Sequence, residues 1–339
     1  MLALCPERHR WFSGLRHSMN PVRKVVHRFM EATGLDCRVD AQAINVWHER
    51  RHARRFPVMA VEVANDWIAE VLRANEPAAI GKLGSSECLT LAWHLGLRRF
   101  YKYTWTSPAF GDLDLAEQSG VFPRTEEMFH QFAELFLERL QDMDGCAVWH
   151  NVGESTVLAQ TCPEARRLEL RSLEPYFFGF PWSAKLAGKR VLVVHPFESS
   201  IRSQFSRREH LWPNHREMLP QFELEVVRSP YGFSKTDFPD WLAMLRWLEQ
   251  QVKAVHRRAP FDIALIGCGA AGLPLASFVK QLGAIGIHTG GATQLFFGIR
   301  GERWDKMPAF QRFFNGAWVR PRPEETPQEA GQVDQGGYW

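Results

Sequence analysis

The sequence lacks the features of a secreted, disulfide-linked protein. Its six cysteines form no C-x-x-C pair, follow no regular spacing, and in several cases stand inside apolar, strand-like runs. The N-terminus carries charges and histidines within its first ten residues, which disfavours a signal peptide. Because disulfide frameworks belong to oxidising compartments, the pattern predicts a cytoplasmic protein with reduced cysteines.

Long uninterrupted apolar runs are also missing. The longest stretches without a charge, residues 263–279 and 281–299, are broken by several glycines and polar residues. A membrane-spanning helix needs about 20 consecutive apolar residues, so we expect buried strands, turns and helices here. With 339 residues, of which 45% are apolar and 23% charged, the chain can bury a large core.

Strong net charge is absent as well, but the charge is uneven. The chain has a net charge of +3, whereas residues 1–60 alone carry eleven Lys/Arg and five Asp/Glu. Such a basic segment could contact anionic lipid or nucleic acid, but the favoured interpretation is a solvated, partly ordered extension. No RNA-binding or helix-turn-helix pattern accompanies it, so no nucleic-acid partner is expected. We expect residues 1–55 to form a basic N-terminal extension.

Strand and helix patterns alternate along the rest of the chain. Apolar residues at helical spacing predict helices near residues 60–72, 124–142 and 239–256, and a further helix begins near Ser86. Short apolar runs predict strands near residues 77–80, 146–149, 189–194 and 262–266, and the alternating run 222–227 suggests an edge strand. The pattern predicts an α/β fold with a Rossmann-like, doubly wound, mostly parallel sheet and helices on both faces. The domain spans residues 56–320, and the tail 321–339, rich in Pro, Glu, Gln and Gly, should be extended.

A glycine-rich turn follows the strand that begins at Asp262. Gly267, Gly269 and Gly272 stand between this apolar strand and an expected helix, in the pattern G-x-G-x-x-G. Such a turn can bring backbone N–H groups and a helix N-terminus to a phosphate. Three interpretations remain open: a dinucleotide site, a site for another phosphate-bearing ligand, or glycines that only let helix and sheet pack closely.

An acidic residue for the ribose of NAD is missing from the next strand. NAD sites usually place Asp or Glu at the end of that strand, about 20 residues on. Here the strand 284–288 is followed by Thr289, Gly290, Gly291, Thr293 and Gln294. The sequence therefore disfavours a dinucleotide.

Carboxylates and hydroxyls follow three other predicted strands. Glu87 comes after Gly84, Ser85 and Ser86 at a helix start, and Glu154 follows the strand 146–149. Each carboxylate could equally be a helix cap. His195 ends another strand, and Ser200 and Arg202 follow it in a turn whose hydroxyl and guanidinium suit a diphosphate.

Together these segments resemble the GT-D type of glycosyltransferase, a family first described as a bacterial domain of unknown function. The resemblance rests on Gly84-Ser-Ser-Glu87, where the family has G-D-G-E, on residues 191–204, and on residues 262–290, and it covers about residues 56–300. Residues 289–304 also resemble a signature of a relative found among polysaccharide-assembly proteins.

The resemblance implies transfer of a sugar from a nucleotide-sugar donor to a lipid-linked or oligosaccharide acceptor in bacterial capsule, exopolysaccharide or envelope-glycan synthesis, at the inner face of the cell membrane. It implies Glu87 or Glu154 as base or orienting carboxylate, with His195 as a second-choice base. The implied donor-binding residues are Gly84, Ser85, Ser86, Ser200, Arg202, Gly267, Gly269, Gly272, Gly290, Gly291, Thr293 and Gln294.

One departure concerns the metal. Ser85 replaces the Asp of the family's D-x-E motif, and Glu87 keeps the second position. A single carboxylate is a poor site for Mg²⁺ or Mn²⁺, which puts Glu87 in doubt as a metal ligand. Two other functions remain open: a Rossmann-type NAD(P)-dependent oxidoreductase, and a non-catalytic nucleotide-binding scaffold of an envelope-assembly complex.

Overall fold

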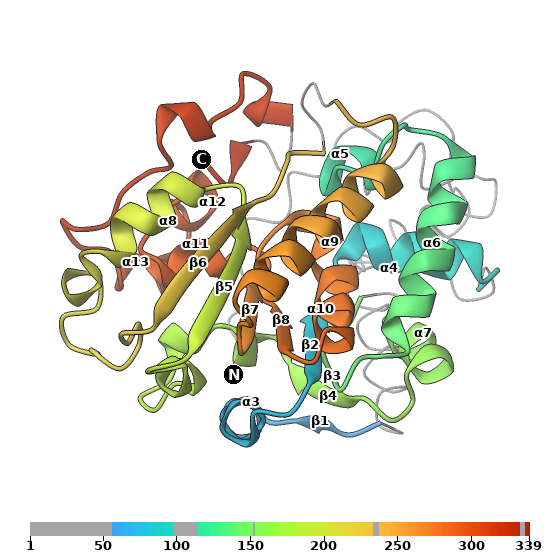
Figure 1. The fold of residues 1–339 in the computed structure, drawn as a ribbon. Coiled ribbons are helices and arrows are strands. Elements are labelled where there is room, and N and C mark those ends of the chain that lie inside the picture. The colour runs from blue at the N-terminus through green and yellow to red at the C-terminus, as the bar shows by residue number, and fades with distance from the viewer. Residues whose placement is uncertain (1–55, 98–113, 152, 233–236, 333–335) are drawn as a thin grey trace, which may run out of the picture. The chain divides into compact units, whose positions relative to one another are not determined.

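A computed structural model describes residues 56–97, 114–151, 153–232, 237–332 and 336–339. The basic extension 1–55 lies outside the described residues, so its role stays a prediction. Strands and helices alternate through the described part of the chain, as the apolar pattern predicted (Figure 1).

The eight strands of the described residues form one parallel sheet in the order β1-β4-β3-β2-β8-β7-β5-β6. The strands are β1 (Val58–Met59), β2 (Ala78–Lys82), β3 (Gly145–Val148), β4 (Arg166–Glu169), β5 (Arg190–His195), β6 (Glu223–Arg228), β7 (Ile263–Ile266) and β8 (Ile285–His288). The alternating strand β6 does lie at an edge. The inner strands β7 and β8 are buried on both faces, which explains their continuous apolar sequence.

Helices cover both faces of the sheet, which confirms the doubly wound α/β fold. One face carries α4 (Ser85–His94), α5 (Leu115–Ser119), α6 (Glu126–Leu140), α7 (Glu154–Thr161), α9 (Trp241–Arg258) and α10 (Gly272–Gln281). The other face carries α3 (Val61–Ala74), α8 (Glu198–Phe205), α11 (Ala292–Phe296), α12 (Glu302–Asp305) and α13 (Pro308–Gln311), together with short 3-10 turns. In Figure 1, α9 and α10 lie in front of the central strands, and α6 lies to their right.

The helix boundaries follow from caps and apolar faces. The Thr125 hydroxyl accepts a hydrogen bond from the Met128 N–H and so caps the N-terminus of α6. The helix therefore begins at Glu126, two residues after the expected start at residue 124. Asp240 caps α9 in the same way through the Ala243 N–H. The buried faces of α6 and α9 meet where Phe132 packs edge-on against Trp241, with ring centroids 4.9 Å apart.

The chain reverses direction across the sheet between β5 and β7. The connection after β5 runs through α8 on one face toward β6, whereas the connection after β7 runs through α10 on the other face toward β8. In parallel α/β sheets, ligands bind beyond the carboxyl ends of the strands at such a reversal. We call the carboxyl ends of β3, β2, β8, β7 and β5, with the residues that follow each, the carboxyl edge.

The C-terminal tail is not extended, contrary to the composition-based expectation. It forms two short 3-10 turns, Pro323–Glu325 and Ala330–Gln332, and its end returns to the domain. The Trp339 carbonyl accepts hydrogen bonds from the Glu302 N–H and from Arg320, and the Trp339 indole donates to the Glu325 carbonyl at 2.9 Å. Tyr338 and Trp339 pack against aromatic residues of the domain. The average composition of the tail did not reveal these apolar contacts.

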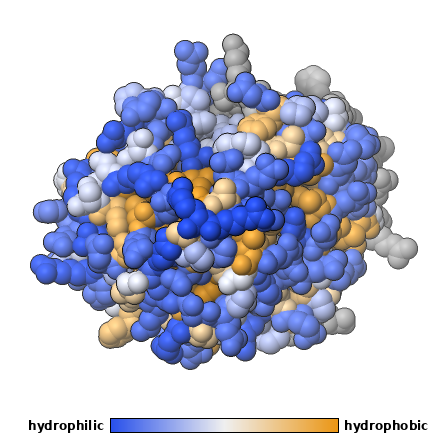
Figure 2. All heavy atoms as spheres, viewed as in Figure 1, coloured by the Kyte–Doolittle hydropathy of each residue, from blue (hydrophilic) through white to orange (hydrophobic). Residues whose placement is uncertain are grey.

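Apolar residues reach the surface in patches between hydrophilic ones on the face shown in Figure 2. The described residues contain no helix that is both long and apolar enough to cross a membrane.

Candidate functional site

The three glycines after β7 have different roles. A Cβ at Gly267 would lie 2.6 Å from Thr293 Oγ1 and 2.7 Å from His195 Cδ2, and a Cβ at Gly272 would fall inside the His288 ring. These two glycines therefore allow close packing. Gly269 differs because it is exposed, has φ = 60° and would place a Cβ in open space, with Ser119 O at 3.6 Å as its neighbour. The phosphate interpretation of the turn now depends on Gly269.

His288, at the end of β8, is a buried residue that the sequence analysis did not single out. Its Nδ1–H donates to the Ile266 carbonyl at 3.2 Å, which leaves Nε2 as an acceptor. Burial, and secondarily the nearby Lys82 ammonium, lowers the pKa of His288 to about 3. Gly81 and Gly272 leave room for the His288 side chain, since a Cβ at either position would contact it. These two glycines were the available sequence signal for a large buried residue here.

His195, at the end of β5, is also buried and neutral. Its Nδ1 accepts a hydrogen bond from the Phe197 N–H at 3.0 Å, so Nε2 carries the proton in the neutral ring. Burial lowers the pKa of His195 to about 3. In this tautomer Nε2–H is a donor, and accepting a proton at Nδ1 would first require the ring to give up the hydrogen bond from the Phe197 N–H.

Glu87 lies in the first turn of α4 with its carboxylate folded back over Gly84. The side chain is 8% exposed, and the Ser86 hydroxyl donates to Oε2 at 3.1 Å. Within the part of the chain that the structure describes, no backbone N–H donates to it. Ser85 donates to Asn151 Oδ1 at 2.8 Å, which ties the start of α4 to the loop after β3.

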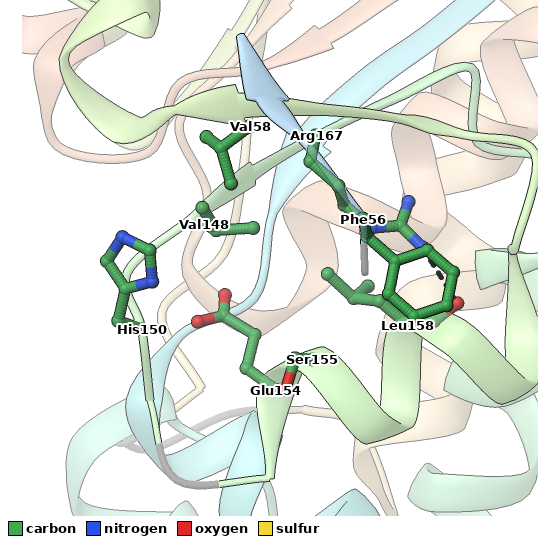
Figure 3. Close-up of a pocket in the computed structure, with 8 residues that line it drawn as sticks. All are labelled: Phe56, Val58, Val148, His150, Glu154, Ser155, Leu158 and Arg167. Carbon is green, nitrogen blue, oxygen red and sulfur yellow. Dashed lines mark hydrogen bonds between the residues drawn. The ribbon is translucent and has the colours of Figure 1, made fainter. Parts of the chain in front are cut away.

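Glu154 is placed differently, as the first residue of α7, directly after the loop that follows β3. Its carboxylate accepts hydrogen bonds from the Trp149 N–H at 3.0 Å and the Asn151 N–H at 2.8 Å, and the residue is buried. It lines a small pocket, where Figure 3 shows the carboxylate beside the side chains of Val148 and His150. These backbone bonds give Glu154 a clear structural task, which is to hold the loop.

Lys82, the last residue of β2, was not among the residues that the sequence analysis proposed. Its ammonium lies 4.5 Å from the centroid of the Trp149 ring, and a Cβ at Gly290 would lie 3.1 Å from Nζ. Burial lowers the pKa of Lys82 to about 8. The carboxylates of Glu87, Glu174 and Glu154 act against this shift, whereas the positive charge of Arg303 adds to it. A lysine that ends an otherwise apolar inner strand was the sequence signal for this position.

The start of α8 holds an internal carboxylate. Glu325 of the C-terminal tail is buried, and it accepts hydrogen bonds from the Ser199 N–H at 2.6 Å, the Ser200 N–H and the Ser200 hydroxyl. Arg202 pairs with Glu198 at 3.0 Å and donates to the Val226 carbonyl of β6. The structure therefore does not bring Ser200 and Arg202 to the open part of the carboxyl edge as a diphosphate site, because the tail supplies the anion that the helix N-terminus favours.

Some of the residues after β8 contact the glycine turn at the end of the sheet, and others contact the C-terminal part of the chain. Thr293 and Thr289 share a hydrogen bond of 2.6 Å beside Gly267 and Gly290. Gln294 is buried and donates to the Tyr338 carbonyl at 3.0 Å, and a Cβ at Gly291 would contact Trp304 at 2.9 Å. Gly290 and Thr293 thus lie with the glycine turn, whereas Gly291 and Gln294 hold the tail.

A divalent cation does not fit the residues around Glu87. Ser85 already donates its hydroxyl to Asn151, and the Lys82 ammonium, which interacts electrostatically with Glu87, repels a cation. Among the described residues, no group of three or more His, Cys, Asp or Glu has the arrangement of a metal site. Metal binding at Glu87 is therefore not supported by this donor set.

Comparisons with known proteins give structural matches only. No protein-family model matches the sequence, and no curated protein matches it significantly. Two solved structures of a domain of unknown function, 1792, match the fold with a TM-score of 0.44 each, at 11% and 12% identity, over 84% of this chain and 98% of each matched chain. The second is described as having "a distinct glycosyltransferase fold". The similarity to these two structures concerns the chain trace and not individual residues.

Proposed function

We propose that this protein is a glycosyltransferase that uses a nucleotide-sugar donor. The observation that carries the proposal is the arrangement of the motifs along the carboxyl edge. Gly84 to Glu87 follow β2, Gly290 to Thr293 follow β8, and the turn with Gly269 follows β7, and these three strands are neighbours in the sheet. Segments separated by about 200 residues of sequence therefore meet at one edge, where parallel sheets bind ligands.

The carboxyl edge offers the groups that glycosyl transfer needs. Attack of an acceptor hydroxyl on the anomeric carbon requires a base within hydrogen-bond reach, and the departing diphosphate requires nearby donors or positive charge. We assign the base to Glu87, because its buried carboxylate receives a side-chain hydroxyl and leaves an oxygen for a substrate. Glu154 is the weaker candidate, because its carboxylate already receives backbone hydrogen bonds from its own loop.

We propose a nucleotide sugar as donor, a lipid-linked or oligosaccharide acceptor of bacterial envelope or capsule synthesis, and a cytoplasmic protein that meets the membrane through its basic residues 1–55. The motif resemblance and the clustered arginines support this assignment.

A donor screen tests the proposed function. The full chain is incubated with UDP-, GDP-, dTDP- and CMP-sugars, with and without chelator, and with saccharide and lipid-linked acceptors. Release of the nucleotide together with a new glycoside is the expected result, and the binding of the donor should also raise the melting temperature. Nucleotide-sugars that neither bind nor react under any acceptor condition would favour the scaffold function instead. An absorbance change of NAD(P)H on binding or turnover would favour the oxidoreductase.

A further inference from the structure

Three donor groups gather at the ends of β2 and β3 without acceptors. Lys82 makes a cation–π contact with Trp149, but among the described residues its ammonium has no hydrogen-bond or ion-pair partner. The indole Nε1 of Trp149 and the amide Nδ2 of Asn151 are buried and also lack partners in the described structure. Because Ser85 donates to Asn151 Oδ1, the amide is oriented with Nδ2 free to donate.

Neighbouring carboxylates do not take up these donors. Glu154 is engaged by the backbone of its loop, and Glu174 accepts from the Tyr176 hydroxyl at 3.3 Å. Burial raises the pKa of Glu174, which reduces its value as a counter-ion. Glu87 lies close enough to affect Lys82 but forms no ion pair with it. A desolvated ammonium and two buried N–H groups without acceptors are costly, and an anion that accepts from all three removes this cost.

We propose that Lys82, Trp149 and Asn151 form a phosphate-binding site that stabilises the leaving diphosphate. This inference rests on the proposed function and adds a charge-stabilising residue to it. In the step, the bond between the anomeric carbon and the phosphate oxygen breaks and its electron pair stays on the phosphate. The acceptor oxygen forms the new bond to the anomeric carbon, and its proton passes to Glu87. Lys82 keeps its three protons and donates hydrogen bonds to the phosphate.

The position of Lys82 explains how the chain can work with Ser85 in place of an aspartate. An ammonium at the end of β2 supplies positive charge beside Glu87, where a cation held by two carboxylates would otherwise be needed. The N-terminus of α8 cannot supply it, because Glu325 already accepts from the backbone N–H groups there. Lys82 therefore supplies positive charge beside Glu87 at the ends of β2 and β3.

Calorimetric titration of the full chain with inorganic pyrophosphate and with UDP and GDP tests this site. Lys82→Met should weaken the binding of pyrophosphate, and of whichever nucleotide binds, by about 10- to 100-fold, the effect of losing charge-assisted hydrogen bonds. Lys253→Met, which changes an exposed lysine on α9, should leave the affinity unchanged. Removing a desolvated ammonium should not lower the melting temperature, so weaker binding would not reflect unfolding.

The pH dependence of binding separates a charge role from a packing role. The groups that face Lys82 are Glu87 of α4, Glu154 of α7, Glu174 before Pro175, His288 of β8 and Arg303 of α12. Wild-type affinity should fall relative to Lys82→Met as the pH rises through about 8, where Lys82 loses its proton. Taking the difference between the two proteins removes the titration of the ligand itself.

The outcomes distinguish this site from the proposed function. Unchanged pyrophosphate and nucleotide affinity in folded Lys82→Met, or an identical pH dependence in both proteins, would overturn the site even if sugar transfer is observed. Lys82-dependent pyrophosphate binding in a chain that transfers no sugar would support the site and contradict the glycosyltransferase. No binding of any of these anions to the wild type would contradict the site directly.

Discussion

At the scale of single residues, the glycines of the motif show how one pattern can serve two purposes. Gly267 and Gly272 make room for His195, Thr293 and His288, and Gly269 alone has the positive φ and open surroundings of a ligand-facing turn. The G-x-G-x-x-G spacing could not separate these roles, because the side chains that fill the space come from other elements, namely β5, β8 and α11.

Gly272→Ala should lower the free energy of unfolding by about 2 kcal/mol or more, since the new methyl group would overlap the His288 ring. Denaturant unfolding measures the change. Gly179→Ala is the matched control, because a Cβ there meets nothing within 4 Å and its φ is not positive, and it should change stability by less than about 0.5 kcal/mol. Equal stability of both variants would show that the His288 ring does not depend on this glycine.

The buried histidines predict acid sensitivity. The pKa of His288 is lowered from 6.5 to about 3 in the folded protein, so the unfolded chain binds more protons between these values. The stability contribution of neutral His288 is therefore present above pH 6.5 and is lost as the pH falls toward 3. His288→Asn should reduce proton uptake on unfolding by about one proton over this range, as the slope of unfolding free energy against pH reports. An unchanged slope in folded His288→Asn would contradict the burial of a neutral His288 ring.

At the scale of elements, the C-terminal tail acts as part of the domain through Glu325. Glu325→Ala should destabilise the protein by about 2–4 kcal/mol, because two backbone N–H groups and a hydroxyl at the start of α8 lose their acceptor. The adjacent Glu324 is exposed, so Glu324→Ala should have an effect below about 0.5 kcal/mol. Thermal and urea unfolding of both variants measure the difference. A Glu325→Ala protein as stable as Glu324→Ala would mean that water replaces the carboxylate without loss.

Strand β4 shows why one element was not predicted. Its sequence, Arg-Arg-Leu-Glu, reads as exposed, yet Arg167 is buried and donates to the carbonyls of Leu158 and Cys162 at the end of α7. The apolar inner strands and the long amphipathic helices could be predicted because their periodicity is local. A charged strand whose guanidinium caps a neighbouring helix has no local apolar pattern.

At the scale of the whole molecule, two features decide which candidate residues meet. One is the order of the strands in the sheet, and the other is the C-terminal tail, which covers the carboxyl edge at α8. The motif order predicted the α/β class and placed Glu87, Gly269 and Gly290 at strand ends. It could not predict that Glu325 would fill the α8 N-terminus or that Lys82 would lie under Gly290, because both depend on contacts between distant segments. The proposed site is consequently shifted from the β5 end toward β2 and β3.

The central claim is that Glu87 takes part in glycosyl transfer, and the comparison of Glu87→Gln with Glu62→Gln tests it most directly. Both residues are acidic and lie in the first turn of a helix, but Glu62 is exposed on α3, so the pair matches the cap and dipole effects of about 0.3–1 kcal/mol. Single-turnover transfer from a donor found by the screen should fall by about 10²–10⁴ in Glu87→Gln and stay unchanged in Glu62→Gln, with similar melting temperatures. A loss of less than about tenfold in folded Glu87→Gln would contradict the claim and leave Glu87 as a helix cap.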